Sequence, residues 1–218
     1  MHPGINGPKL KDKPAIIMAG SGDVITHQEL NELSNQAAQL FRSLGLKPGD
    51  SMAFMMENHK LFFPIAFAAW RSGLKYTAIS WRLQANEVEY IVKDCGAKVF
   101  ITSKFLEESA KDLESSLQGV HKFMLDGESG DFKSFEDAIE TMPVEPIEDE
   151  CQGAAMLYSS GTTGKPKGVS REINLSPLPY DSADDDLGLT RVVQGLYSAD
   201  EESIYLSPAP LYLSLIHI

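Results

Sequence analysis

The sequence is poor in cysteine, in long apolar runs and in positive charge, and each shortage excludes a class of protein. Its two cysteines, Cys95 and Cys151, stand in no CxxC or other metal-ligand spacing, so we expect neither a disulfide framework nor a cysteine metal site. The longest apolar run, Leu61 to Trp70, is interrupted by a proline and is too short to cross a bilayer. Residues 1–13 lack the apolar stretch of a signal peptide. These features predict a cytoplasmic protein without a transmembrane segment.

The charge balance is acidic. The 218 residues include 31 Asp and Glu against 19 Lys and Arg, which gives a formal net charge of -12. Such a surface repels phosphate backbones, so general nucleic-acid binding is not expected. A local anion site is compatible with this charge, because backbone N–H groups can bind phosphate whatever the net charge. Hydrophobic residues make up 43% of the chain, an ordinary value for a globular protein with a packed core.

Short strand-like runs alternate with amphipathic segments along the chain. We expect strands at residues 15–18, 23–25, 51–56, 75–80, 98–102 and 122–125, and helices at 26–44, 59–72 and 85–94. Thr26 and Glu29 form a capping box that begins the first helix, and Gly45 ends it. Ser103 is expected to cap a further helix. This alternation predicts an α/β fold with layered, mostly parallel sheets and helices on both faces.

An acidic stretch marked by two prolines follows this alternation. Residues 141–150 read Thr-Met-Pro-Val-Glu-Pro-Ile-Glu-Asp-Glu, a composition typical of a solvated connector. Residues 154–158, Ala-Ala-Met-Leu-Tyr, then predict a buried strand that leads directly into a glycine-rich loop.

The loop after this strand combines small residues, hydroxyl groups and lysines. Its glycines permit positive φ angles and close backbone approach, so consecutive N–H groups can converge on an anion. Its lysines offer compact positive charges for phosphate, and the proline between them stiffens the backbone. A polyanion such as a triphosphate is the natural ligand for this arrangement. The candidate phosphate-binding residues are Ser159, Ser160, Gly161, Thr162, Thr163, Gly164, Lys165, Pro166, Lys167 and Gly168.

Two other nucleotide-binding motifs are absent from the sequence. The Walker A pattern ends in Gly-Lys-Ser/Thr, whereas here Gly164 and Lys165 are followed by Pro166. No G-x-G-x-x-G dinucleotide fingerprint occurs either. A flexible Gly/Ser/Thr linker would explain the small polar residues, but it would not explain two lysines and a proline directly after a buried strand.

The stretch Tyr-Ser-Ser-Gly-Thr-Thr-Gly-Lys-Pro-Lys-Gly at residues 158–168 resembles the AMP-binding signature of the adenylate-forming superfamily. That superfamily contains acyl-CoA synthetases, adenylation domains of nonribosomal peptide synthetases and firefly luciferase. Flanking segments also resemble acyl-CoA synthetases, at residues 25–30, 31–44, 45–50, 71–79, 86–103 and 205–212. The resemblance implies that residues 1–212 are the N-terminal portion of the large AMP-binding domain.

The resemblance further implies a two-step ligase reaction that uses ATP, Mg²⁺ and coenzyme A. A carboxylic acid, expected to be a fatty acid, attacks the α-phosphate of ATP to give an acyl-adenylate and pyrophosphate, and the thiol of coenzyme A then displaces AMP. Lys167, Thr162 and Thr163 are expected closest to the phosphates. Lys165 holds a variable motif position and is expected in solvent. Beyond this loop, no catalytic residue or metal ligand is expected in the chain.

The end of the sequence departs from the family pattern. The DNA sequence CTG TCT CTT ATA CAC ATC, which resembles a transposase end used in sequencing adaptors, would encode residues 213–218. We therefore expect these six residues to be an artefact. Family elements that follow this region are absent, and the chain is therefore expected to be truncated and inactive as a ligase on its own. Three alternatives remain open: a peptide-synthetase adenylation domain, a luciferase-like enzyme, and a nucleotide-phosphate-binding module without catalysis.

Overall fold

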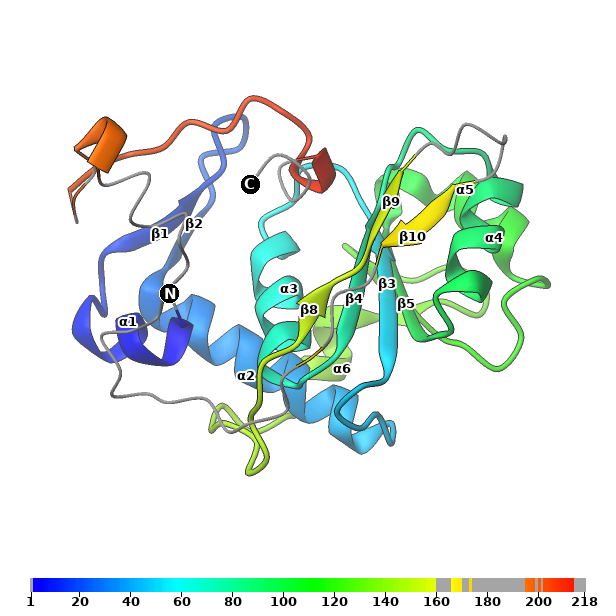
Figure 1. The fold of residues 1–218 in the computed structure, drawn as a ribbon, viewed down its shortest axis with the longest axis horizontal. Coiled ribbons are helices and arrows are strands. Elements are labelled where there is room, and N and C mark those ends of the chain that lie inside the picture. Colours follow the sequence, from blue (N-terminus) through cyan, green and yellow to red (C-terminus); the bar gives the residue numbers. More distant parts are fainter. Residues whose placement is uncertain are drawn as a thin grey trace.

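The chain is built on a six-stranded sheet with the strand order β7-β6-β5-β3-β4-β8 (Figure 1). The computed structural model describes residues 2–159, 166–169, 173, 195–198, 200 and 202–213. The strands are β3 (Ser51–Met55), β4 (Lys75–Ile79), β5 (Ala97–Ser103), β6 (His121–Leu125), β7 (Lys133–Ser134) and β8 (Ala154–Ala155). Neighbouring strands pair in parallel throughout this sheet. The expected α/β fold class is confirmed.

Helices cover both faces of the sheet, because each parallel connection returns the chain over one face (Figure 1). The helices are α1 (Pro3–Lys9), α2 (His27–Ser43), α3 (Phe62–Arg71), α4 (Ala85–Asp94), α5 (Glu107–Leu113) and α6 (Phe135–Glu140), with a 3-10 turn η1 (Lys104–Leu106). One apolar cluster joins the sheet to α2, α3 and α6, and a second joins it to α4 and α5. The central strand β3 is buried at every residue after Ser51.

Two small antiparallel sheets flank this core. The first pairs β1 (Pro14–Ile17) with β2 (Val24–Thr26), and the second pairs β9 (Leu157–Ser159) with β10 (Lys167–Val169). The expected capping box begins α2: the Glu29 carboxylate accepts the Thr26 N–H at 2.7 Å, and the Thr26 hydroxyl accepts the Glu29 N–H at 3.2 Å. Gly45 follows this helix with a φ of 82°, a conformation that favours glycine.

The connector at residues 141–150 is mostly exposed, as expected, but it also packs against α2, which the sequence did not predict. Asn35 donates its side-chain N–H to the Val144 carbonyl at 2.5 Å, and Gln39 donates to the Glu145 carbonyl at 3.1 Å. Ile147 and Glu150 are buried. The polar face of α2, opposite its core-facing leucines, supplies the donors that hold the connector in place.

Three further details differ from the expectations. Ser103 does not cap a helix, because its hydroxyl donates to the Glu57 carboxylate at 2.5 Å. The single buried strand expected at residues 154–158 is divided into β8 and β9, and its residues are only partly buried. The short elements α1, β7 and α6 were not expected, because so few residues show no clear periodicity.

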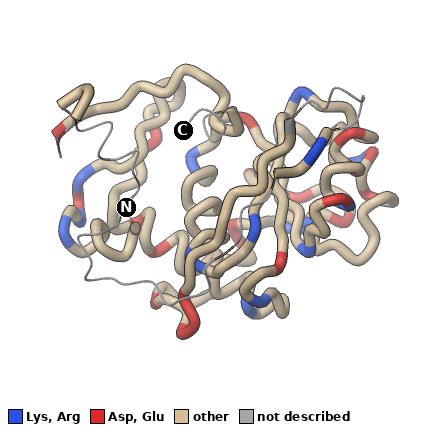
Figure 2. Tube along the Cα trace, viewed as in Figure 1, with Lys and Arg blue, Asp and Glu red and all other residues tan. Residues whose placement is uncertain are grey.

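Charged residues are distributed along the whole fold. Figure 2 shows Lys and Arg interspersed with Asp and Glu, without a continuous basic stripe over the described part of the chain.

Candidate functional site

The candidate phosphate loop is closed at its base by the β9–β10 hairpin. Lys167 pairs with Ser159, Gly168 with Tyr158 and Val169 with Leu157 in an antiparallel register. The two ends of the loop, Ser159 and Lys167, are therefore held opposite each other across a strand pair. Among the ten expected site residues, Ser160, Gly161, Thr162, Thr163, Gly164 and Lys165 lie outside the described residues.

The described end of the loop presents an exposed cation. Pro166 is partly buried and Lys167 is exposed. Within the described ranges, the Lys167 ammonium has no hydrogen bond or ion pair to another side chain.

The two strands of the hairpin cross closely at Gly168. A Cβ atom added there would lie 2.5 Å from Met156 Cε, 2.9 Å from Tyr158 Cζ and 3.0 Å from Tyr158 Oη. Distances this short are not found between real atoms of these types, so a side chain at position 168 would displace the tyrosine ring. The glycine therefore leaves room for the side chains of Met156 and Tyr158, besides any role in binding an anion.

The Tyr158 phenol attaches the hairpin to α4. Its O–H donates to Asp94 Oδ2 at 2.5 Å, and Asp94 is the last residue of α4. Burial, followed by this hydrogen bond, raises the pKa of Tyr158 above its ordinary value. The phenol therefore remains protonated and donates at neutral pH.

The strand that leads into the hairpin is fixed at the edge of the sheet. β8 pairs in parallel with β4, in the register Lys75 to Ala154 and Tyr76 to Ala155. Gly153 donates its N–H to the Trp70 carbonyl at 2.6 Å, and Met156 donates to the Tyr76 carbonyl at 2.8 Å. These bonds hold the chain from residue 153 to residue 156 against the end of α3 and along β4.

A buried ion pair anchors the chain just before β8. Arg71 Nε lies 2.6 Å from Glu150 Oε1, and the two side chains are 1% and 6% exposed. Arg71 also donates to the Ser34 hydroxyl at 2.8 Å and to the Asn31 carbonyl at 3.2 Å. Burial lowers the pKa of Arg71 and raises that of Glu150, and in each case the partner's charge opposes the effect.

Sequence reasoning did not find the residues that support the loop. Glu150 belongs to the acidic run of residues 148–150, so no local pattern distinguishes it. Arg71 did give a signal, because it is a single charge directly after the longest apolar run of the chain. Asp94 gave none, since an acidic residue at the end of an amphipathic helix is common.

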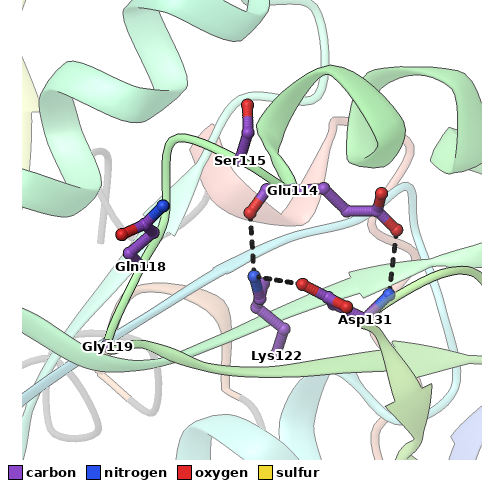
Figure 3. Close-up of a pocket in the computed structure, with 6 residues that line it drawn as sticks. All are labelled: Glu114, Ser115, Gln118, Gly119, Lys122 and Asp131. Carbon is purple, nitrogen blue, oxygen red and sulfur yellow. Dashed lines mark hydrogen bonds and ion pairs between the residues drawn. The ribbon is translucent and has the colours of Figure 1, made fainter.

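A hollow on the described surface is lined by no residue of the hairpin (Figure 3). It has a volume of about 440 Å³ and is lined by Glu114, Ser115, Gln118, Gly119, Lys122 and Asp131. The Lys122 ammonium already donates to the Glu114 carbonyl at 2.9 Å and contacts Asp131 Oδ2 at 3.2 Å. An anion would have to displace both partners, so this hollow is a poor phosphate site.

The described residues contain neither a cluster of metal ligands nor a helix that could span a membrane. In these ranges, no three His, Cys, Asp or Glu side chains gather closely enough to hold a metal ion. The described helices include none with the length and apolar character needed to cross a membrane. Cys95 and Cys151 are both buried free thiols, and Cys95 packs in the second apolar cluster, as expected for a small core residue.

The arrangement of the sheet defines the class of protein. The chain superposes on a solved structure from Rhodopseudomonas palustris with a TM-score of 0.79 at 20% identity. That protein is described as a long-chain-fatty-acid CoA ligase. The superposition covers 96% of this chain and 50% of that one. The fold is therefore that of the N-terminal domains of adenylate-forming enzymes.

The chain belongs to the family of AMP-binding enzymes, whose profile matches residues 6–217. A fatty acid–[acyl-carrier-protein] ligase from Streptomyces coeruleorubidus is 29% identical over 157 residues, which are 72% of this chain and 29% of that protein. A feruloyl-CoA synthase from an Amycolatopsis species is 28% identical over 148 residues, 68% of this chain and 28% of that protein. The chain thus spans less than a third of the length of these two relatives.

Proposed function

We propose that the loop of the β9–β10 hairpin binds the β- and γ-phosphates of ATP, and that the protein is an acyl-CoA synthetase. The observation that supports this most directly is the pairing of Ser159 with Lys167, which holds the ends of the signature loop together below an exposed lysine. The residues between these two ends are of the types that the sequence analysis assigns to a phosphate site. Glycine N–H groups, four hydroxyls and Lys167 are suited to a polyphosphate there.

In this proposal the loop stabilises the charge that develops when pyrophosphate leaves. A carboxylate oxygen of the acid attacks the α-phosphorus, the bond from that phosphorus to the bridging oxygen breaks, and pyrophosphate departs with the electron pair. Lys167 and the hydroxyls of Thr162 and Thr163 would hold the phosphates, and preorganised donors of this kind favour charge development. Lys165 would remain in solvent.

The second step would transfer the acyl group to a thiol. The sulfur of coenzyme A attacks the acyl carbon, the bond to the phosphate oxygen breaks, and AMP leaves as the thioester forms. When bound, Mg²⁺ would supply positive charge that offsets the negative charge of the phosphates. It prefers oxygen ligands, and we assign it to the phosphates of ATP rather than to side chains of the described residues.

The acid is expected to be a fatty acid or another small carboxylic acid, which the names of the relatives support. A carrier-protein thiol is the second candidate acceptor, because the Streptomyces coeruleorubidus relative is a ligase of that kind.

We place the enzyme in the cytoplasm, where two unpaired thiols remain reduced. Residues 1–212 would form the N-terminal part of the AMP-binding domain, and residues 213–218 would not belong to it. The 218 residues alone are expected to form no acyl-adenylate.

Exchange of labelled pyrophosphate into ATP tests this function in the protein expressed from its natural gene. Lys167→Ala and the double change Thr162→Ala with Thr163→Ala should each reduce exchange by about 100-fold, the effect of removing a preorganised donor to a developing charge. Lys165→Ala is the matched control and should exchange normally. Undiminished exchange with Lys167 and both threonines replaced would refute the proposal. Thioester formation with coenzyme A, compared with an acyl carrier protein, then identifies the acceptor.

A further inference from the structure

We propose that Asp94 is a positioning residue for the phosphate loop: it fixes the β9–β10 hairpin through the hydroxyl of Tyr158. The inference rests on the proposed function of that loop and deepens it. Asp94 lies 64 residues before Tyr158 in the sequence and outside the signature. It would act on ATP binding without touching the nucleotide.

The α4 helix offers a rigid support for this contact. Val88, Ile91 and Val92 are each at most 2% exposed in the second apolar cluster, so the helix is held firmly on the sheet. Asp94 is the last residue of that helix, and its Oδ2 accepts the phenol at 2.5 Å. A short hydrogen bond to an ionised acceptor is stronger and more directional than a bond between neutral groups.

The hairpin needs such a contact because few hydrogen bonds join it to the body of the protein. β9 and β10 form a sheet of their own and do not extend the ladder of the six-stranded sheet. The phenol of Tyr158 makes a side-chain hydrogen bond from β9 to α4. The backbone bond from Met156 to Tyr76 lies just before β9. The phenol therefore controls how the hairpin is oriented beyond that point.

Movement of the Tyr158 ring would be passed to both strands. The ring belongs to β9 and packs against the second apolar cluster. Gly168 of β10 crosses it so closely that even a methyl group would not fit between them. A shift of the ring thus displaces Lys167, the neighbour of Gly168 and the opposite partner of Ser159.

Four substitutions in the natural gene product test the inference, the last of them as a control. Tyr158→Phe keeps the ring and its packing but removes the donor, and Asp94→Ala removes the acceptor. Each should raise the KM for ATP in pyrophosphate exchange about tenfold, the factor that corresponds to one hydrogen bond to a charged group, with a much smaller change in kcat. Asp94→Asn keeps an acceptor oxygen and should restore most of the affinity. Glu89→Gln, which neutralises another acid on α4, should behave as wild type.

A double-substitution cycle separates positioning from general damage. Tyr158→Phe combined with Asp94→Ala should be no worse than either change alone, because both remove the same bond. Additive losses, or an unchanged KM in both single variants, would overturn the inference. If Lys167→Ala is impaired while Tyr158→Phe is normal, the loop function stands and the role of Asp94 fails. If Lys167→Ala is also normal, the proposed function itself fails.

Discussion

Replacing Glu150 by alanine should destabilise the fold far more than replacing an exposed acid. Glu150 lies 2.6 Å from the guanidinium of Arg71, whose side chain is 1% exposed. Alanine removes the counter-charge but leaves the guanidinium buried. Its remaining partners are the Ser34 hydroxyl and the oxygens of Asn31, which are neutral.

The size of the effect follows from the cost of a buried, uncompensated charge. Breaking a buried ion pair on one side costs about 3–5 kcal/mol, while a folded domain is stable by only about 5–15 kcal/mol. For a protein of this size, that loss lowers the melting temperature by about 6–20 °C. Arg71→Met combined with Glu150→Leu should restore most of the lost free energy of unfolding, because the buried charge is removed together with its partner.

Thermal and urea unfolding followed by far-ultraviolet circular dichroism measures these differences. Glu108→Ala is the matched control: it breaks an ion pair with Lys111 at 2.8 Å, but its side chain is 89% exposed. Exposed pairs of this kind contribute about 0–1 kcal/mol. If Glu150→Ala unfolds with the same midpoint as Glu108→Ala, the reasoning about the buried pair is refuted.

Two further predictions concern pH and the crossing of the hairpin strands. Burial raises the pKa of Tyr76 to about 12 and also raises that of Tyr158, so the folded state favours the neutral phenols. The stability that these groups contribute is fully present below their ordinary pKa of about 10 and is lost as pH rises toward the folded-state values. Melting curves at rising pH should therefore show a falling melting temperature. Tyr76→Phe should make this fall less steep. Gly168→Ala should cost about 1–3 kcal/mol by overpacking and should weaken ATP binding, because the new methyl group pushes the Tyr158 ring away from Asp94. Calorimetric titration with ATP and thermal melting check the second prediction, and a variant that binds and melts like wild type would contradict it.

Local signals in the sequence were sufficient to predict most of the regular elements. Both bounds of α4, Ala85–Asp94, agree with the expectation, and the capping box of Thr26 and Glu29 forms as its residue types require. The alternation of strands and helices predicted a parallel sheet, and the structure has one. These features depend on neighbours a few residues apart, which a sequence displays directly.

The supports of the candidate site depend on contacts that a single sequence does not display. The side chains of Arg71 and Glu150 meet only after α3 and the connector have packed against α2. Asp94 and Tyr158 meet only because the hairpin leaves the edge of the sheet toward α4. The signature itself could be recognised because its chemistry is concentrated in consecutive residues, whereas the residues that orient it are distributed over the fold.

The docking of the connector along α2 has a consequence for synthesis on the ribosome. β4 can pair with β3 early, but its other edge stays uncovered until residues 154–155 emerge and form β8. During that interval the nascent chain exposes an open strand edge, a feature that promotes aggregation. By then α2 has already been synthesised, and the side-chain amides of Asn35, Gln36 and Gln39 can donate hydrogen bonds to the connector as it emerges. These bonds hold the connector so that β8 can pair with that edge. The strands β9 and β10 follow β8 in the chain and therefore emerge after this edge has been covered.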